Sequence, residues 1–290
     1  GDNALSANTS GANNTAIGQA SLCTNLTGGS NVAVGRCTLK LNTASNNVAV
    51  GYHSMCTNSS GTENTAIGLA SLKSNTTASQ NTALGNQTLC KNTTGASNTA
   101  VGACALEANT IGCFNTAVGS NSFRLNTIGN FNAAVGSGSL DANTEGDLNT
   151  AIGSFSLTDN TTGNRNTAVG QEALGDNITT SDNTAVGFNA LRLNTAASNT
   201  AVGACALAAN QTGEKLVAVG ALALDANTTA DDNTAVGYCS LSTNTTGCRN
   251  VAMGCGSLKT NLTGDRNTSV GHIAMEGNTS ADNNTAVGYA

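Results

Sequence analysis

A single motif dominates the chain. The pentapeptide Asn-Thr-Ala-Val-Gly, or a near copy, recurs seventeen times, and successive copies begin seventeen residues apart except for two steps of sixteen, Asn31 to Asn47 and Asn183 to Asn199. Such self-similarity is typical of one short structural unit stacked many times. We therefore expect a single repeat domain over residues 1–290. Because the chain opens and closes within a repeat, we expect it to be a fragment or processed part of a longer chain.

The composition narrows the class of protein. Abundant Gly, Asn and Thr raise the alternative of low-complexity disorder, but aliphatic residues recur in phase with the repeat and the net charge is only −6. Eleven basic against seventeen acidic side chains form no basic stripe, and aromatic residues are few. This excludes the usual nucleic-acid surface. No apolar run is long enough for a membrane span.

The repeat unit predicts its own local structure. We number it from the Asn of each pentapeptide as position 1. Position 4 is aliphatic, as in Val34, Val50 and Ile67, position 9 is Leu, Met or Phe, position 5 is always Gly, and turn-type residues follow position 11. Alternation along a strand predicts that positions 2 and 4 face the core. Seventeen residues are too few for a helical pair, so we expect an all-β fold: a parallel β-solenoid of about 17 coils, roughly 80 Å long.

Roles can also be predicted for three repeat positions that carry polar or small residues, namely positions 1, 12 and 3. The Asn residues at positions 1 and 12 are expected to form hydrogen-bonded ladders from coil to coil. Position 3, Ala in sixteen of seventeen copies, would point outward and form a smooth subunit interface, for which Ala100, Ala117 and Ala151 are the candidates. The alternative is that crowding inside one thin coil demands Ala there.

The repeated N-[TV]-A-[VIL]-G followed by [AS]-L resembles the head repeats of trimeric autotransporter adhesins of the YadA type, and related repeats of phage and viral tail fibres. The resemblance covers essentially all 290 residues. It implies a left-handed parallel β-roll, assembled as a trimer and displayed on a cell or virion surface to bind matrix or host molecules. The chain departs from that family in its longer unit, its ten cysteines and the lack of a coiled-coil stalk or membrane anchor.

Ten cysteines without a metal-type C-x-x-C cluster indicate an oxidising compartment. The candidate disulfides are Cys104–Cys113 and Cys239–Cys248, each within one coil. An alternative pairing links position 10 of one coil to position 7 of the next, as in Cys90–Cys104, and free buried thiols are a third possibility. Asn-x-Ser/Thr sequons at position 12 are candidate glycosylation sites, unless the amides point inward as turn residues. They are Asn25, Asn58, Asn75, Asn92, Asn160, Asn177, Asn210, Asn227, Asn244, Asn261 and Asn278.

No catalytic, cofactor or metal constellation emerges, because His53 and His272 lie some thirteen coils apart and the carboxylates are scattered. We therefore expect a non-catalytic extracellular rod: a fibre shaft, surface spacer or filament subunit. Its expected partners are further copies of itself, as a homotrimer or filament, and host-surface or matrix molecules. The alternative is an ice-binding β-solenoid with Thr ladders. The exchange of Thr for Val at position 2 argues against it, since it suggests inward-facing methyl groups.

Overall fold

The computed structural model describes residues 1–289, which form two compact units, Gly1–Asp147 and a second unit beginning at Leu148. The described residues contain β-strands and turns but no helix. Every strand is the three-residue centre of one pentapeptide, where β-branched residues at positions 2 and 4 favour extended backbone. The first unit contains β1 (Thr15–Ile17), β2 (Val32–Val34), β3 (Val48–Val50), β4 (Thr65–Ile67), β5 (Thr82–Leu84), β6 (Thr99–Val101), β7 (Thr116–Val118) and β8 (Ala133–Val135). The second contains β9 (Thr150–Ile152), β10 (Thr167–Val169), β11 (Thr184–Val186), β12 (Thr200–Val202), β13 (Val217–Val219), β14 (Thr234–Val236), β15 (Val251–Met253), β16 (Thr268–Val270) and β17 (Thr285–Val287).

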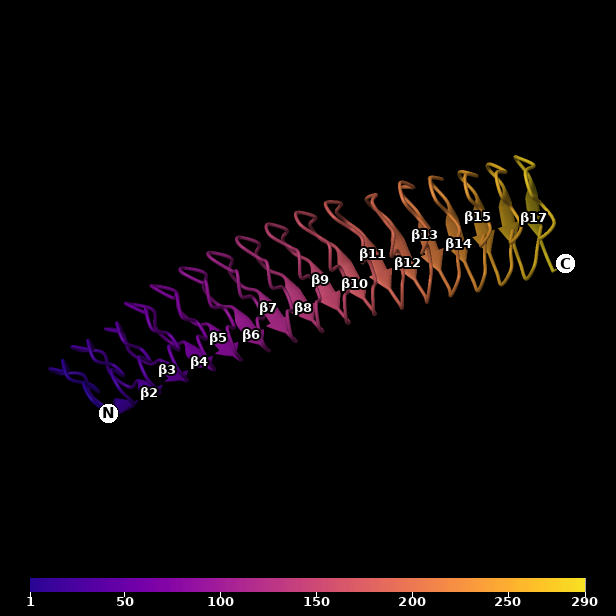
Figure 1. Ribbon diagram of the computed structural model, residues 1–290. Helices are drawn as coiled ribbons and strands as arrows, with labels where there is room; N and C mark the ends of the chain where they lie inside the picture. The colour runs from indigo at the N-terminus through magenta and orange to yellow at the C-terminus, as the bar shows by residue number, and fades with distance from the viewer. Residues whose placement is uncertain (290) are drawn as a thin grey trace. The chain divides into compact units, whose positions relative to one another are not determined.

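Within each unit every strand pairs in parallel with the next strand of the chain. Thr65 pairs with Thr82, Ala66 with Ala83 and Ile67 with Leu84 across β4 and β5, and the same register recurs from strand to strand. Figure 1 shows one such strand in each coil, with the turns of the coil completing the circuit. One repeat is therefore one coil, and the predicted parallel β-solenoid is confirmed.

The expected orientation of the strand side chains was wrong. Position 3 points into the coil: Ala100, Ala117 and Ala151 have no exposed surface. Positions 2 and 4 face outward, so that Ile67 at position 4 is 42% exposed and Thr116 at position 2 is also exposed. The alternative of crowding inside a thin coil is the correct one. The Ala row lies within its own chain and cannot form the subunit interface predicted for it.

Small interior side chains follow from the narrow cross-section of the coil. The interior is filled by the Ala row, by Ser, Ala or Thr at position 8, and by the large side chain at position 9, as in Leu72, Leu89 and Phe123, all fully buried. A strand of three residues contributes one inward side chain, and only a methyl group fits opposite the row of position 9. The burial of position 9 accounts for its restriction to the large apolar residues Leu, Met and Phe.

Backbone with positive φ makes the corners of each coil. Gly102 at position 5 has a φ of 128°, and a Cβ there would lie 2.4 Å from the carbonyl oxygen of Gly119 in the next coil. This close approach explains the invariant Gly. Leu72 and Leu89 at position 9 also have positive φ, 48° and 50°. The left-handed conformation costs roughly 1–2 kcal/mol, which burial of the Leu side chain at ~1.5–3 kcal/mol offsets.

The two sixteen-residue coils keep the register of their neighbours. In the coil that begins with β2, Asn42 Nδ2 donates to the carbonyl oxygen of Ala44, two residues on, at 2.7 Å. In the next coil Asn58 Nδ2 donates to Gly61, three residues on, at 2.9 Å. Strands β2 and β3 still pair residue for residue. The missing residue is therefore absorbed in the turn after position 12.

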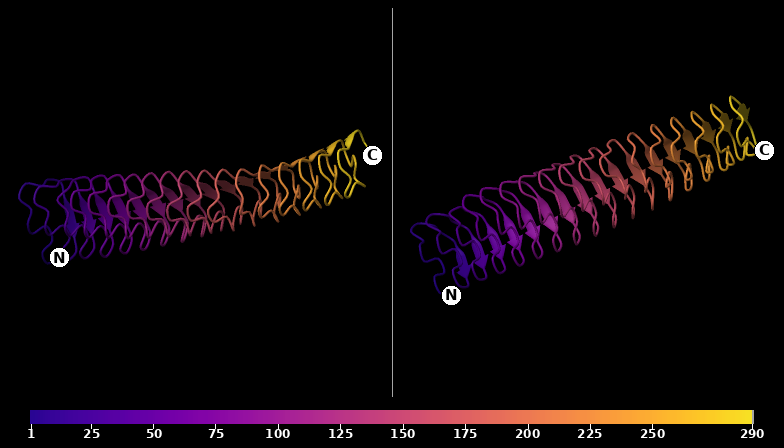
Figure 2. Two further views of the ribbon diagram at one scale, coloured as in Figure 1. Left: turned by 90° about the horizontal axis from the view of Figure 1, so that it is seen from above. Right: turned by 45° about the horizontal axis from the view of Figure 1, so that its top comes forward.

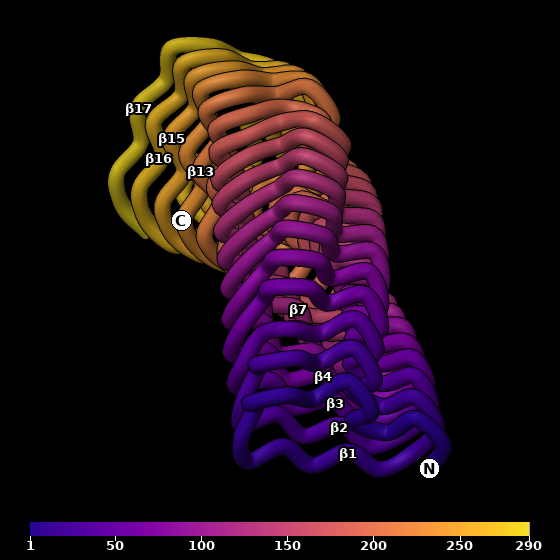
Figure 3. The backbone as a smooth tube through the Cα atoms, turned by 90° about the vertical axis from the view of Figure 1, so that its left-hand side faces the viewer, coloured from indigo at the N-terminus to yellow at the C-terminus, as the bar shows by residue number. Residues whose placement is uncertain are grey.

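Two further views show the same arrangement within each unit. In Figure 2 the strands of successive coils stack along one side of the unit, and looped turns form the others. The backbone trace in Figure 3 shows that neighbouring coils repeat the same sequence of bends. No helix among residues 1–289 is long and apolar enough to cross a membrane.

Candidate functional surfaces

The two predicted Asn ladders are present. At position 12, Asn75 Nδ2 donates to Asn58 Oδ1 of the preceding coil at 2.7 Å and to the carbonyl oxygen of Ala78 at 3.0 Å. At position 1, the backbone amide of Asn64 donates to Asn47 Oδ1 at 3.0 Å, and Asn64 Nδ2 donates to Ala78 at 2.9 Å. Both ladders thus converge on the same turn carbonyl and link each coil to the next.

These hydrogen bonds also determine whether the asparagines of the sequons can carry glycans. Ten of the eleven candidate asparagines are fully buried, and the partly buried Asn278 donates from Nδ2 to Asn261 and to Ala281 at 3.1 Å each. A glycan on Nδ2 would remove these hydrogen bonds and could not fit inside the coil. The inward-pointing alternative is correct, and glycosylation is incompatible with the folded coil at the ten buried sites, which are Asn25, Asn58, Asn75, Asn92, Asn160, Asn177, Asn210, Asn227, Asn244 and Asn261.

All ten cysteines are free thiols, so neither predicted within-coil disulfide is formed. Cys104 Sγ lies 3.9 Å from Gln87 Oε1, and Cys113 Sγ accepts from the amide of Ala96 at 3.3 Å, each sulfur contacting its equivalent position in the preceding coil. The same holds for Cys248, whose Sγ accepts from a residue of the preceding coil at 3.4 Å. Positions 7 and 16 therefore occupy separate rows, as Cys239 and Cys248 also do.

The cysteines of the alternative pairing are also free, although they lie close enough to influence one another. Burial is the main cause that raises the pKa of the Cys90 thiol, and the charge of Cys104 contributes in the same direction. The pKa of Cys56 is likewise raised by burial first, with contributions from Cys37 and Cys23. Thiols at positions 7 and 10 of neighbouring coils thus lie within electrostatic range of one another.

The outward side chains at positions 2 and 4 make what we call the strand face. Thr or Val stands at position 2, with Ala133 of β8 the exception, and Val, Ile, Leu or Met stands at position 4. In-register pairing repeats both rows at the ~4.8 Å strand spacing, and the two rows stand roughly 6.6 Å apart along each strand. Val118 and Ile152 are 36% and 42% exposed. Each unit therefore presents a regular two-row array of methyl and hydroxyl groups. The sequence did not predict this surface, because positions 2 and 4 were expected to face the core.

A hollow lies beside the turns that follow β11, β12 and β13 in the second unit. It has a volume of about 340 Å³ and lies between position 7, represented by Asn189 and Leu222, and position 10, represented by Arg192, Ala208 and Asp225. Two of the lining residues, Asn189 and Asp225, each have an Oδ1 atom that is buried away from solvent without a hydrogen-bond partner. Burial raises the pKa of the Asp225 carboxyl, while the backbone amides of Asp225 and Ala226 act in the opposite direction.

Other charged groups lie on the surface. Arg124 pairs with Asp141 at 3.0 Å and Arg165 with Asp182 at 2.7 Å, in partly exposed positions where an ion pair contributes ~0–1 kcal/mol. His53 stacks on its neighbour Tyr52, and burial, aided by nearby Lys and Arg side chains, lowers its pKa. Within residues 1–289 no three His, Cys, Asp or Glu side chains are grouped as metal ligands.

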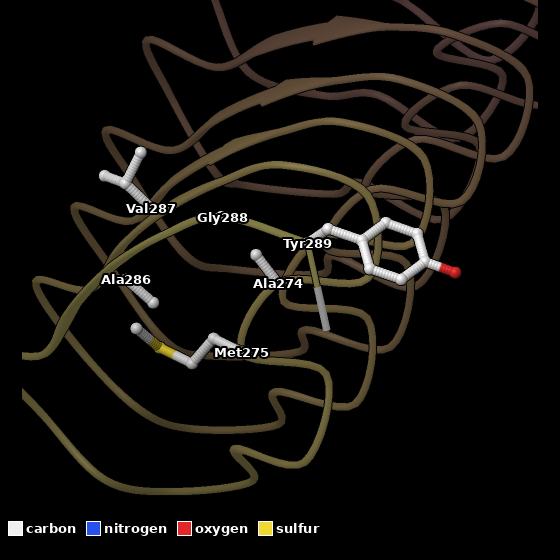
Figure 4. A pocket seen from close by; sticks show the side chains of 6 residues that line it. All are labelled: Ala274, Met275, Ala286, Val287, Gly288 and Tyr289. Carbon is white, nitrogen blue, oxygen red and sulfur yellow. The ribbon is translucent and has the colours of Figure 1, made fainter.

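A second, smaller hollow of about 150 Å³ opens at the last described coil (Figure 4). Figure 4 shows Met275 and Ala286 directed toward each other below the backbone, with Ala274 nearby and Tyr289 at the rim. The Tyr289 ring stacks on His272 at 5.3 Å. The hollow exposes the interior rows of the coil, and its lining is mainly apolar.

No protein-family model matches this chain, and no curated protein matches it either. The resemblance to the head repeats of trimeric autotransporter adhesins therefore stays a prediction.

Proposed function

We propose that this chain is a non-catalytic structural and adhesive rod, used outside the cell as a fibre shaft, surface spacer or filament subunit. The observation that carries the proposal is the in-register stacking of coils, which repeats the same surface side chains at every strand from β1 to β8 and again from β9 to β17. Such a surface supports many equivalent weak contacts rather than one pocket. The extracellular placement rests on the resemblance of the repeat to the head repeats of surface adhesins.

Self-association would use the strand face, because the Ala row is enclosed by its own coil. Apolar side chains at position 4 provide contact area, and the low charge of the chain limits repulsion between copies. A trimer or filament and the host-surface or matrix partners expected from the resemblance remain parts of this proposal.

Negative-stain microscopy and small-angle scattering of the purified chain test the rod. We expect elongated particles, and deletion of residues 64–97, which form two coils, should shorten them by ~10 Å, two strand spacings, without changing their width. Compact particles, or a deletion variant that unfolds while single-coil substitutions elsewhere are tolerated, would contradict the proposal.

The orientation of the strand face favours a second candidate, ice binding. The argument against ice binding requires Thr and Val at position 2 to point inward, whereas they face outward in regular rows. A regular array of Thr methyl and hydroxyl groups beside Val methyl groups, repeated at the ~4.8 Å strand spacing, can order water.

Thermal hysteresis of the purified chain decides this candidate. We expect a freezing-point gap that falls when Thr99 and Thr116 on the strand face are both replaced by Lys, and that is unchanged when the exposed turn residue Thr94 is replaced by Lys. The absence of hysteresis in the unaltered protein, together with unrestrained recrystallisation of ice, would eliminate ice binding and leave the rod proposal intact.

A further inference from the structure

Four basic side chains of the first unit gather on one part of its surface. Residues 3–106 contain these four and a single acidic residue, Glu63, whereas residues 107–290 contain seven basic and fifteen acidic side chains. All four stand at repeat positions 6, 10 and 11, in the turns that follow β2, β4 and β5, and Asp2 and Glu107 lie beyond the two ends of the group. We call the group the basic patch: Arg36, Lys40, Lys73 and Lys91.

The charges of the patch act together on His53. This residue lies in the turn after β3, between the coils that carry Lys40 and Lys73. Burial is the main cause that lowers its pKa, and three cations of the patch lower it further, namely Lys73, Arg36 and Lys40. No carboxylate among residues 1–289 contributes to this shift. Side chains from successive coils therefore form one positively charged surface.

Nothing in the first unit neutralises the patch. Within residues 1–289 no ion pair includes any of its four side chains. Position 10 alternates between Cys and Lys in these coils, and burial raises the pKa of Cys56 and Cys90, so both thiols are uncharged at pH 7. Glu63 lies at position 17, before the strand rather than after it, and accepts from Gln80 Nε2 at 3.2 Å. An anion that reaches the patch therefore meets uncompensated positive charge.

The arrangement of the cations favours a linear polyanion. The patch extends over four successive coils, from β2 to β5, which is about 15 Å along the stack at the strand spacing. Three of its side chains are exposed and Lys40 is half-buried, so a ligand that lies across the turns can reach all four. One exposed ion pair contributes little. Several anionic groups on one chain add their contributions.

The aromatic residue beside the patch argues against nucleic acid. Single strands bind basic surfaces by stacking their bases on exposed aromatic rings. The Tyr52 ring stacks on His53, with 4.0 Å between the centroids, and the guanidinium of Arg36 lies over it at 5.9 Å. Because the protein's own side chains engage this ring, the surface favours an anion recognised by its charge rather than by its bases.

We propose that the basic patch binds a linear sulfated polysaccharide. The polysaccharide lies along the stack, and its sulfate groups pair with the three lysines and with Arg36. Binding is non-covalent and uses the turns, not the strand face. The inference rests on the proposed extracellular rod, because it names one class of matrix molecule to which that rod adheres.

Titration calorimetry of the whole chain with a heparin octasaccharide tests the patch, at a salt concentration of about 0.1 M, where the Debye length is ~10 Å. We expect saturable binding that weakens as the salt concentration is raised. The double variant Lys40→Gln, Lys73→Gln should bind at least about tenfold more weakly, because charge-assisted hydrogen bonds are lost. Absence of saturable binding to the unaltered protein would overturn the proposal.

The matched control is the double variant Lys215→Gln, Lys259→Gln. It removes the same charge, and Lys259 occupies position 10 as Lys40 does, but neither residue belongs to the patch. Its affinity should change by less than about twofold, because charges beyond a Debye length are screened. Equal losses in the two double variants would mean that binding follows the net charge, and would overturn the patch. Circular dichroism confirms that each variant is folded.

Histidine NMR provides a readout that needs no substitution. Sulfate groups beside His53 should raise its pKa, since a nearby anion stabilises the protonated ring. His272 in the second unit should keep its pKa. An unchanged pKa of His53, or an equal rise at both residues, would overturn the site.

Two further ligands identify the partner. A hyaluronan octasaccharide, which has carboxylates but no sulfates, and an oligothymidylate of the same charge as the heparin fragment should each bind at least about tenfold more weakly. Equal affinity for hyaluronan would refute recognition of sulfate, and equal or tighter binding of the oligothymidylate would assign the patch to nucleic acid. Elongated particles that do not bind heparin would refute this inference and leave the rod intact, whereas compact particles would refute the rod.

Discussion

Replacing Asn109 by Ala tests whether the position-12 ladder holds the coils together. Asn109 is fully buried, donates to Asn92 Oδ1 at 2.7 Å and to Gly112 at 3.0 Å, and accepts from Asn126. After the substitution Gly112 keeps the bond from Asn98 Nδ2 at 2.9 Å, and Asn126 keeps its own turn carbonyl at 3.1 Å. Asn92 Oδ1 loses the bond from Asn109 and gains no replacement.

The expected cost follows from these bonds. One buried acceptor left unsatisfied costs ~1–3 kcal/mol, and the volume vacated by the amide of Asn109 adds a cavity term, for a total of about 2–4 kcal/mol. For a unit of this size such a loss lowers the melting temperature by about 5–15 °C. Thermal unfolding followed by far-ultraviolet circular dichroism measures it.

The matched control is Asn86→Ala, which removes an exposed amide from the same unit. It should move the melting temperature by less than about 2 °C, as surface substitutions do. If Asn109→Ala and Asn86→Ala melt at the same temperature, the ladder does not contribute the stability that its geometry implies, and the explanation for the recurrent Asn fails.

Three further predictions concern the interior, the corner and the hollow. Ala117→Leu should overfill the coil and cost about 1–3 kcal/mol of stability. Thr116→Leu on the strand face should leave the melting temperature nearly unchanged. If Thr116→Leu were the more destabilising of the two, position 2 and not position 3 would face the interior. Gly119→Ala should destabilise by ~1–3 kcal/mol, because φ is 136° and the new Cβ would lie 2.4 Å from the Gly136 oxygen, and an unaffected melting temperature would contradict that contact. Burial raises the pKa of the Asp225 carboxyl, so its ionisation destabilises the fold as pH rises from the unfolded pKa of about 3.9 through the folded one. Asp225→Asn should therefore be more stable than the unaltered protein at pH 7, with the difference vanishing near pH 3; a difference independent of pH would refute this cause.

Much of the fold could be predicted from the spacing of residues. The seventeen-residue period defines the coil, and β-branched residues beside Gly define its strand and corner. The Asn ladders were predictable because an amide that recurs in register can donate and accept along the stack, as Asn58 and Asn75 do.

The orientation of the strand could not be obtained from hydrophobicity alone. Size favours Val34 over Ala33 as the core residue, yet Ala33 is buried and Val34 is not. The strand contributes one interior side chain to a coil too thin for a second large one beside Leu39. The near-invariance of Ala was the relevant signal, and it indicated steric limits rather than a partner.

The hollow lay beyond prediction for a different reason. It depends on the relative sizes of Arg192, Ala208 and Asp225 in three consecutive coils, and on which of their neighbours supply hydrogen bonds. The sequence shows the small side chain of Ala208. It does not show that Asn189 Oδ1 and Asp225 Oδ1 lack hydrogen-bond partners, because that depends on how the coils stack.

The shortened turn after Asn42 has a consequence for how such a protein changes over time. One residue is absent there, yet the neighbouring strands stay paired residue for residue. The loss or gain of a residue at this corner leaves the pairing of the strands unchanged. We therefore expect insertions and deletions to accumulate at this turn, and to be rare in the rest of the coil. The same corner is the natural place to graft a foreign epitope, and a chain with several such corners could display many copies at fixed intervals.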